Sequence, residues 1–280
     1  MHKFTGDSEI RWDGHTHGPY CRHGSSALME SYIVRAADLG FQRISLTEHP
    51  PLPDQWLKDV SVQRILGMDK EDLPRYLEDA LVVKRKFQET IDVRIGYELD
   101  YLEDNEDFTW MLLERGKHVI EEVIISVHYL PGKNGMRCVD LSAQDIQEGL
   151  LTYYGCMERL VEVYFEHQER AITLAQKFDV PVRLGHVTLI DKFLRDLPAY
   201  DPEMRKPYLD DVFNMLAKSR IQLDANMAGI DIPSCGVSYP AMAEIIRAKE
   251  IGVSCIFGSD AHAPESIGRH YNVYATGFLE

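Results

Sequence analysis

Short apolar runs alternate with longer amphipathic stretches along most of the chain. Seven runs rich in β-branched residues predict strands, at residues 10–13, 43–47, 93–99, 122–127, 180–184, 221–225 and 254–258. Between them, apolar positions at helical spacing predict helices at residues 27–39, 73–88, 105–117, 155–177, 203–219 and 240–249. Regular alternation of strand and helix is typical of a parallel sheet, and seven or eight such units over this length predict its closure into a (β/α) barrel.

One segment departs from this alternation. After the second predicted strand, residues 49–68 show no periodic pattern, and Pro50, Pro51 and Pro53 oppose helix formation. A long irregular loop in a compact domain is more often functional than idle. We therefore expect this loop to form a wall or lid of the active site, with a purely connecting surface loop as the alternative.

Composition limits the classes to which the protein can belong. With 280 residues and 45% hydrophobic side chains, residues 1–280 can bury one large core, and we expect a single domain. The net charge of −15 disfavours nucleic acid and anionic membranes as partners, whereas a small anionic substrate is compatible with local cations in a cleft. The five cysteines form no CxxC pair, and no apolar stretch reaches the roughly 18 residues of a membrane span. These features predict a cytoplasmic protein with reduced thiols.

Metal-ligand side chains gather at the ends of the predicted strands. Six of the seven strands lead to such residues: His15 and His17, His49, Glu98, His128, His186, and Asp260 with His262. In a (β/α) barrel, active sites are built at the carboxyl ends of the strands. Residues i and i+2 of an extended segment project to the same side, so His15 and His17 can hold one cation, with Asp260 and Glu98 completing it. Histidine and carboxylate ligands without cysteine favour zinc, manganese or iron.

Each of these histidines also has a simpler interpretation. A histidine at the end of one strand is more often a hydrogen-bonded polar residue than a metal ligand. Eight potential ligands at one end of one barrel are not expected by coincidence, so the metal interpretation is favoured. The remaining histidines outside the motifs lie at the terminus, on helical patterns or after the last motif, and we expect none of them to bind metal: His2, His118, His167 and His270.

Six motifs in a fixed order show a resemblance to a known family. They are DGHTH at 13–17, TEH at 47–49, GYE at 96–98, SVH at 126–128, GH at 185–186 and GSDAH at 258–262. Over nearly its whole length the chain resembles the polymerase and histidinol phosphatase (PHP) family, and HPPLP at 49–53 and GYELDY at 96–101 resemble its histidinol-phosphatase branch. The resemblance implies a distorted, TIM-like (β/α)7 barrel with three divalent metal ions, which hydrolyses L-histidinol phosphate to L-histidinol and phosphate in histidine biosynthesis.

The resemblance also implies a set of ligands for each ion. The first ion would have four, namely His15, His17, Glu98 and Asp260. The second ion would share Glu98 with the first and would also be bound by His128 and His186. The third would be held by His23, His49 and His262, although the glycine-rich loop around His23 by itself predicts a solvated side chain. The implied catalytic residues are Glu98, Asp260 and His262.

The expected reaction needs a nucleophile and groups that hold the phosphate. Divalent ions lower the pKa of bound water from about 15.7 to about 7, so attack by a metal-bound hydroxide is expected. Four side chains close to the ligands in sequence are candidates to orient the imidazoles: Asp13, which could equally be a structural cap, Glu48, Asp100 and Ser126. Guanidinium groups pair well with phosphate, and the candidates for substrate binding are Arg22, Arg159 and Arg195.

Other functions remain open from the sequence. A PHP-type phosphodiesterase or nuclease would fit the same motifs, but the acidic charge and the lack of a basic tract disfavour it. A phosphatase of another small phosphate ester is a further alternative. A metal-binding scaffold without turnover is disfavoured because buried polar clusters are costly to keep. An amidohydrolase-like site would be expected to place a lysine at a strand end, and none is predicted there.

Overall fold

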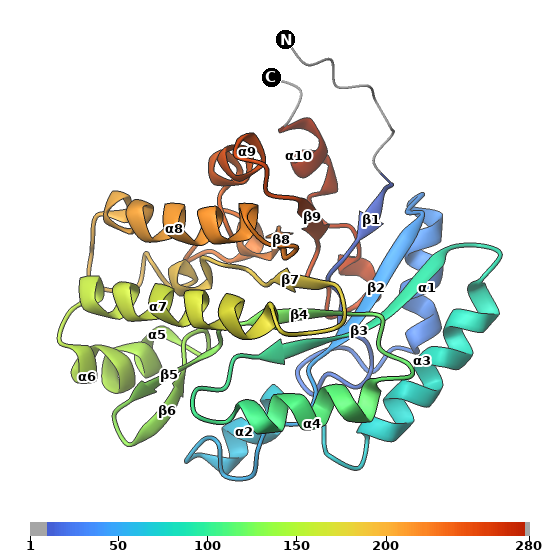
Figure 1. Cartoon of the computed structure of the whole chain (residues 1–280), viewed down its shortest axis with the longest axis horizontal. Helices are drawn as coiled ribbons and strands as arrows, with labels where there is room; N and C mark the ends of the chain where they lie inside the picture. The colour runs from blue at the N-terminus through green and yellow to red at the C-terminus, as the bar shows by residue number, and fades with distance from the viewer. Residues whose placement is uncertain (1–9, 278–280) are drawn as a thin grey trace.

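Seven parallel strands form a curved, nearly closed sheet at the centre of the molecule (Figure 1). The structure is a computed structural model that describes residues 10–277. In their order across the sheet, the strands are β1 (Trp12–Asp13), β2 (Arg43–Glu48), β3 (Asp92–Asp100), β4 (Glu122–Ser126), β7 (Val182–Leu184), β8 (Gln222–Asn226) and β9 (Cys255–Gly258). Each strand pairs in parallel with the next, so the predicted distorted (β/α)7 barrel is confirmed.

Main-chain hydrogen bonds join the two ends of the sheet. Just beyond β1 and β9, Gly14 N donates to Phe257 O, His17 N donates to Ala261 O, and Asp260 N donates to His15 O, each at 2.8 Å. Position 14 requires glycine, because a Cβ there would lie 2.7 Å from Ile256 Cγ2. These contacts place DGHTH against GSDAH, although the two motifs come from opposite ends of the chain.

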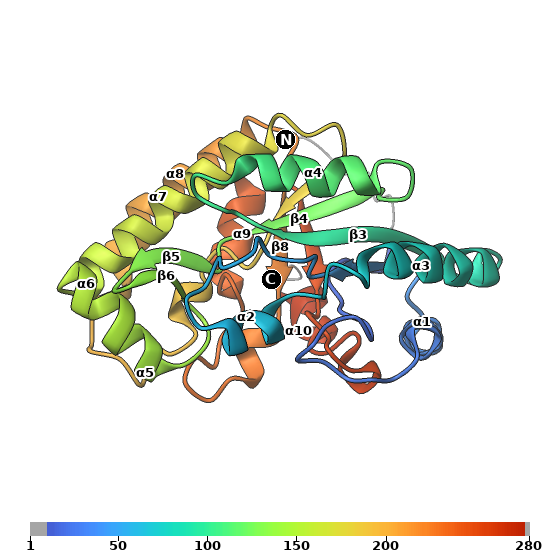
Figure 2. The same cartoon turned by 90° about the horizontal axis from the view of Figure 1, so that it is seen from below.

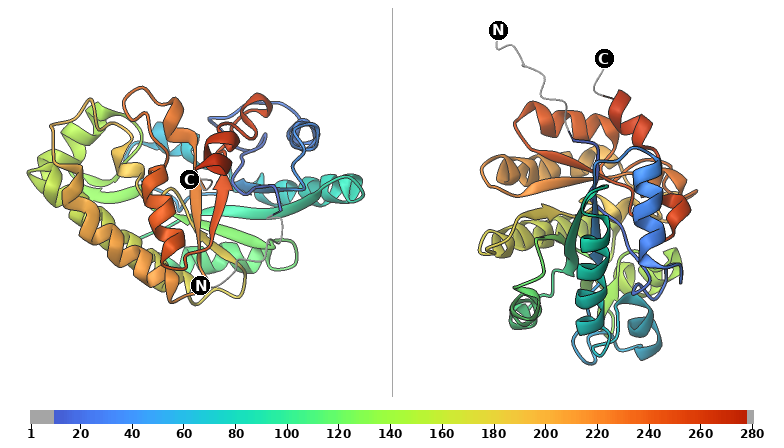
Figure 3. Two further views of the ribbon diagram at one scale, coloured as in Figure 1. Left: turned by 90° about the horizontal axis from the view of Figure 1, so that it is seen from above. Right: turned by 90° about the vertical axis from the view of Figure 1, so that its right-hand side faces the viewer.

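Helices cover the outer side of the sheet (Figure 3). They are α1 (Met29–Asp38), α3 (Leu73–Phe87), α4 (Glu106–Gly116), α7 (Met157–Ala175), α8 (Lys206–Ala217), α9 (Met242–Glu250) and α10 (Tyr271–Thr276). Their amphipathic pattern explains their packing; α7, for example, buries Leu160, Tyr164 and Ala171 and exposes Glu158 and Arg170. The six helices predicted from the sequence are all present, with ends shifted by a few residues.

Two parts of the fold differ from the sequence prediction. A short helix, α2 (Val60–Leu66), lies within residues 49–68, so the expectation of an irregular loop is wrong there. The Asp59 carboxylate caps this helix by accepting hydrogen bonds from Ser61 N and Val62 N. Between β4 and α7, the chain inserts a hairpin and three short helical turns: β5 (Tyr129–Gly132), β6 (Gly135–Cys138), α5 (Ala143–Asp145), η1 (Ile146–Leu151) and α6 (Thr152–Tyr154).

These two additions lie beside each other (Figure 2). An isolated bridge joins Leu57, in the segment before α2, to Met136 on β6. A small apolar cluster, separate from the main core, fills the space between them and contains Leu52, Leu57, Leu102, Tyr129 and Cys138. The proline-rich segment is therefore held in place by this small apolar cluster, which is separate from the main core.

Toward the amino ends of the strands, a buried ion pair fills the interior of the sheet. Arg183 on β7 is 1% exposed, and its guanidinium donates to Gly14 O at 2.6 Å and to Glu122 Oε1 at 2.8 Å. The same guanidinium lies 4.9 Å from the centre of the Trp12 ring. The Arg183, Glu122 and Trp12 side chains therefore pack together inside the sheet at this level.

Short 3₁₀ turns complete the connections at η2 (Leu189–Asp191), η3 (Pro202–Arg205), η4 (Ala228–Asp231) and η5 (Pro264–Ser266). Both η2 and η4 follow strands of the central sheet and lie next to the candidate site. Among residues 10–277, no helix is both long enough and apolar enough to cross a membrane.

Candidate metal centre

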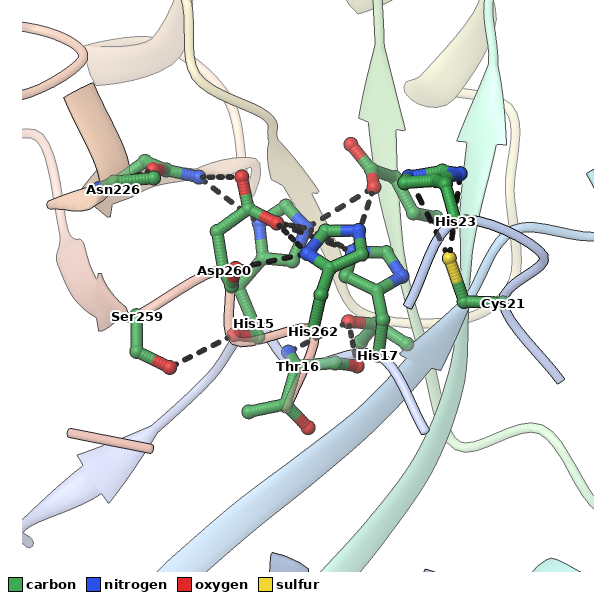
Figure 4. Close-up of polar contacts among 12 residues, drawn as sticks. His15, Thr16, His17, Cys21, His23, Asn226, Ser259, Asp260 and His262 are labelled. Carbon is green, nitrogen blue, oxygen red and sulfur yellow. Dashed lines mark hydrogen bonds and ion pairs between the residues drawn. The ribbon is translucent and has the colours of Figure 1, made fainter. Parts of the chain in front are cut away.

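The eight potential ligands predicted at strand ends converge at the carboxyl end of the sheet. Figure 4 shows the part of this site that contains His15, His17, Asp260 and His262. Glycines in the motifs make this approach possible. A Cβ at Gly258 would lie 2.2 Å from Asp224 Oδ1 and 2.8 Å from His15 Cβ, and a Cβ at Gly185 would lie 2.0 Å from Ser126 Oγ. Glycine, which has no side chain, is therefore needed at the ends of β7 and β9, where the chain positions the ligands that follow these strands.

A first cluster joins the ends of β1, β3 and β9. His15 Nε2 lies 3.0 Å from His17 Nε2 and 3.1 Å from Glu98 Oε2. His17 Nε2 lies 3.2 Å from Glu98 Oε2 and 3.3 Å from Asp260 Oδ1. These four side chains form the set that the resemblance assigns to the first ion.

A second cluster lies on the other side of the Glu98 carboxylate. Glu98 Oε1 is 2.8 Å from His186 Nε2 and 3.6 Å from His128 Nε2, and the two imidazole nitrogens are 3.1 Å apart. Glu98 thus directs one oxygen to each cluster, which is the arrangement expected of a bridging carboxylate.

A third cluster surrounds the loop after β1. Ligand atoms of His17, Cys21, His49 and His262 lie within 4.8 Å of one another. The His23 ring is close by, with its centre 4.7 Å from that of His262 and 5.4 Å from that of His49. The structure therefore brings His23 next to His49 and His262, and it adds Cys21, which the sequence did not predict here.

Many polar atoms in these clusters are not satisfied by one another. His15 and His128 direct Nδ1 to Asp224 and Asp100, so in that tautomer each Nε2 presents a lone pair to another imidazole. Among the described imidazoles of the three clusters, four further buried nitrogens have no hydrogen-bond partner: His17 Nδ1, His49 Nδ1, His186 Nδ1 and His262 Nε2. Leaving a buried polar group unpaired costs about 1–3 kcal/mol. Bound cations would remove this cost, so the donor set fits a metal centre.

The charges of the ligands also suit a cation. Burial opposes ionisation of Glu98, but the imidazoles of His15 and His49 outweigh it and hold the pKa of Glu98 well below its usual range. Burial likewise opposes the charge of Asp260, and His15 holds the pKa of Asp260 well below its usual range. Burial lowers the pKa of His49, and burial together with His17 lowers the pKa of His262 to about 3. The carboxylates are therefore anionic and these two imidazoles neutral, which are their metal-binding forms. Burial lowers the pKa of His15, His17 and His128, but the neighbouring carboxylates outweigh burial and raise it, so a cation must displace protons from these three imidazoles.

A cavity of about 350 Å³ opens directly onto the ligands. Its lining includes ligands from all three clusters: His23, His49, Glu98, His128, His186, Asp260 and His262. Ile65 and Leu66 of α2 also line it, so the expectation that residues 49–68 form a wall of the site is confirmed. The volume is in the range of pockets that bind small molecules.

Comparison with known proteins agrees with this geometry. The family model of the PHP domain matches residues 13–228, which is most of the chain, and a model described as PHP-associated matches residues 243–279. The chain belongs to the PHP family.

Three relatives of this PHP protein are similar over nearly their whole lengths. The histidinol-phosphatase of Bacillus subtilis (strain 168) is 29% identical over 94% of this chain and 97% of its own. A Deinococcus radiodurans protein described as a probable histidinol-phosphatase is 31% identical over 91% of this chain and 88% of its own. A crystal structure from Listeria monocytogenes, described as that of a putative histidinol phosphatase, superposes with a TM-score of 0.88 at 32% identity, covering 94% of this chain and 99% of that one.

Carboxylates and a hydroxyl orient the ligands of the PHP site. Asp100 Oδ1 lies 2.7 Å from His128 Nδ1, so Asp100 orients an imidazole as the sequence predicts. Ser126 Oγ donates to Glu98 Oε1 at 2.6 Å, so Ser126 orients a ligand, but this ligand is the carboxylate and not an imidazole. Asp224 Oδ2 lies 2.8 Å from His15 Nδ1, a role that sequence reasoning missed. The signal was available, because Asp224 and Asn226 are at positions i and i+2 of β8 and share one face.

Two other residues expected to orient imidazoles hold loops instead. Asp13 accepts hydrogen bonds from Ser259 N and Gly268 N, both at 2.9 Å, so its alternative interpretation as a structural cap is the correct one. Glu48 accepts from Gly18 N at 2.8 Å and Tyr20 N at 3.3 Å. Both carboxylates therefore fix the loops that carry the ligands.

The structure does not bring the three candidate arginines to the PHP cavity. Arg22 pairs with Asp69 and Asp72, and Arg159 pairs with Glu162 and Glu166, all partly exposed to solvent. Arg195 donates to Pro233 O at 2.6 Å. Because acidic residues are in excess in this chain, the three guanidinium groups pair with nearby carboxylates or a carbonyl. The placement of these arginines therefore does not support a role in substrate binding.

Two other cations line the cavity. The Lys192 ammonium, after β7, lies 2.9 Å from Asp140 Oδ2. The Arg269 guanidinium, before α10, donates to Ser259 O and Asp260 O, both at 2.6 Å. No strand end marks either residue in the sequence, which explains why the motif analysis overlooked them.

The remaining histidines lie outside the three clusters of the described chain. His167 Nδ1 bonds with Val163 O at 2.8 Å, and His270 Nε2 lies 2.6 Å from Asp231 Oδ1. His118 belongs to none of the clusters among residues 10–277. The prediction for His2 lies outside the described residues.

We expect Asp224→Asn to weaken metal binding without unfolding the protein. Asp224 holds His15 by Nδ1, and loss of such a partner typically lowers metal affinity or activity about 10–100-fold. Elemental analysis after dialysis against a weak chelator measures the retained metal, with Asp210→Asn on α8 as a surface control. Unchanged retention in Asp224→Asn would show that the contact does not tune the ligand.

Proposed function

We propose that this protein is a metal-dependent phosphomonoesterase that hydrolyses L-histidinol phosphate to L-histidinol and phosphate. One observation carries the proposal: Glu98 lies within 3.6 Å of imidazole nitrogens from all three clusters, beside a cavity of small-molecule size. Relatives that carry the name histidinol-phosphatase match the chain almost end to end, which supports the choice of substrate.

The ligands divide among three ions, which we propose to be zinc, iron or manganese. His15, His17, Glu98 and Asp260 hold the first, Glu98, His128 and His186 the second, and His23, His49 and His262 the third. Such ions supply Lewis acidity and generate a nucleophile from water near neutral pH. Glu98, Asp260 and His262 are the proposed catalytic residues, because they border the cavity where the phosphate must lie.

The cavity wall supplies contacts for both ends of the substrate. Lys192 and Arg269 are the cations that can attract the phosphate dianion. Leu189, Ile232 and Tyr239 form an apolar wall suited to the carbon chain and imidazole ring. The Asp140 carboxylate, next to Lys192, can accept a hydrogen bond from the substrate ammonium.

We further propose that the enzyme works in the cytoplasm, in histidine biosynthesis, on a small molecule and not on nucleic acid or membranes. The net charge of −15 supports this, since phosphate backbones and anionic lipids would be repelled. A phosphatase of another small ester is the alternative that the cavity also fits.

A panel of substrates tests the proposal. The measurement is phosphate release from histidinol phosphate, a generic aryl phosphate and an aryl phosphodiester, each with and without chelator. We expect the highest kcat/KM with histidinol phosphate and loss of all activity with chelator. Faster cleavage of the diester would favour a phosphodiesterase, and equal rates for both monoesters would favour a broad phosphatase.

We expect Lys192→Ala to raise KM for histidinol phosphate by roughly 10-fold or more. A hydrogen bond to a charged group contributes about 1.5–3 kcal/mol, and 1.4 kcal/mol corresponds to about a tenfold change. Steady-state kinetics measures the effect, and Arg195→Ala is the matched control because Arg195 does not line the cavity. Equal KM values in the two variants would remove Lys192 from the phosphate site.

A further inference from the structure

Cys21 places a thiol inside the third cluster. It lies in the loop between β1 and α1, is 4% exposed, and forms no disulfide. Its Sγ is 3.5 Å from both ring nitrogens of His23 and belongs to the group of ligand atoms that includes His49 and His262. Figure 4 shows the Cys21 sulfur facing the His23 ring. No expected ligand set contains a cysteine.

Hydrogen bonds on both sides hold this thiol in place. Before Cys21, Glu48 fixes the loop through Gly18 N and Tyr20 N. After it, Gly24 N donates to Cys21 O at 3.2 Å, and Ser25 N donates to His262 O at 2.7 Å. The loop is therefore bound to the segment that carries His262. These hydrogen bonds fix the position of Cys21 in the cluster.

The imidazoles of the same cluster supply an independent sign of a ligand. His17 Nδ1, His49 Nδ1 and His262 Nε2 are buried, and within residues 10–277 none has a hydrogen-bond partner. The His17 and His49 side chains are 0% and 9% exposed, so water cannot freely satisfy them. Buried, unpartnered nitrogens beside a buried sulfur are typical donors for a soft transition metal.

We propose that Cys21 is a further ligand of the third ion, adding a sulfur donor to the histidines of that site. The inference rests on the proposed metal centre and assigns a residue that the centre does not require. On binding, the Cys21 S–H bond breaks, a metal–sulfur bond forms, and the proton passes to solvent. The thiolate makes the third site softer than the other two, so it selects zinc, iron or cobalt over manganese.

Cobalt is the probe for the first test. The protein is freed of metal, loaded with Co²⁺, and its near-ultraviolet absorption recorded, because thiolate ligation gives an intense sulfur-to-cobalt charge-transfer band. We expect this band in the parent protein and its loss in Cys21→Ser. Cys138→Ser is the matched control, since Cys138 is also buried but lies outside the cluster and should keep the band. A band that persists in Cys21→Ser would overturn the proposal.

A second measurement needs no variant. X-ray absorption at the zinc edge of the zinc-loaded parent protein should show a sulfur neighbour at about 2.3 Å in addition to nitrogen and oxygen. Bound zinc and histidinol-phosphate hydrolysis without a sulfur neighbour would refute Cys21 as a ligand and leave the proposed function standing. Failure to bind Co²⁺ or Zn²⁺ at all would overturn both.

Discussion

Glu98→Gln is expected to abolish turnover while leaving the protein folded. Glu98 is 1% exposed, and its two oxygens face imidazoles from different clusters, so the neutral amide removes the one charge that the clusters share. Loss of a single charge-stabilising group in an active site costs about 10²–10³-fold in kcat, and a shared ligand should reach the upper end. The measurement is kcat for histidinol phosphate, with elemental analysis of the same sample.

The control for this variant is Glu121→Gln, which alters a partly exposed carboxylate paired with Lys84 away from the site. Circular dichroism should show the same fold in the parent and both variants. If Glu98→Gln kept most of its activity and its full metal content, the bridging role of Glu98 would have to be abandoned.

Removal of metal is expected to eliminate activity and to lower the melting temperature. An ion present at 1,000 times its Kd stabilises the folded state by about 4 kcal/mol. At about 2–4 °C for each kcal/mol, loss of one such ion corresponds to roughly 8–16 °C. The parent protein should bind close to three ions, and dialysis against a strong chelator followed by thermal unfolding measures the loss.

Re-addition of Zn²⁺, Mn²⁺ and Fe²⁺ to separate samples should restore both properties with at least one ion, and the sample with the highest kcat identifies the ion that supports turnover. A protein that melts at the same temperature before and after chelation, with one ion or none by elemental analysis, would contradict the three-ion assignment.

Much of this site could be predicted because the fold brings residues at similar positions of successive strands together in space. The carboxyl ends of parallel strands share one edge, so DGHTH and GSDAH can be expected to meet even though they lie far apart in sequence. The alternation of side chains in an extended segment also explains why His15 and His17 point the same way. Neither inference needs any long-range contact to be known.

The rest could not be predicted for equally physical reasons. The partner of a long, flexible arginine depends on which carboxylate the fold brings near, and Arg22 meets Asp72 only because the loop after β1 lies beside the start of α3. Lys192 and Arg269 reach the cavity from irregular segments that have no periodicity. The β5–β6 hairpin and α2 are short, so their stability comes from packing against each other and not from local propensity.

The ion pair of Arg183 and Glu122 has a consequence for the route by which the substrate enters and the products leave. Because these buried side chains occupy the interior of the sheet, and the cavity beside the ligands opens on the carboxyl side, we expect the ester to enter and the alcohol and inorganic phosphate to leave by that same opening. Phosphate that stays bound would occupy the place of the next ester, so we expect inorganic phosphate to inhibit competitively.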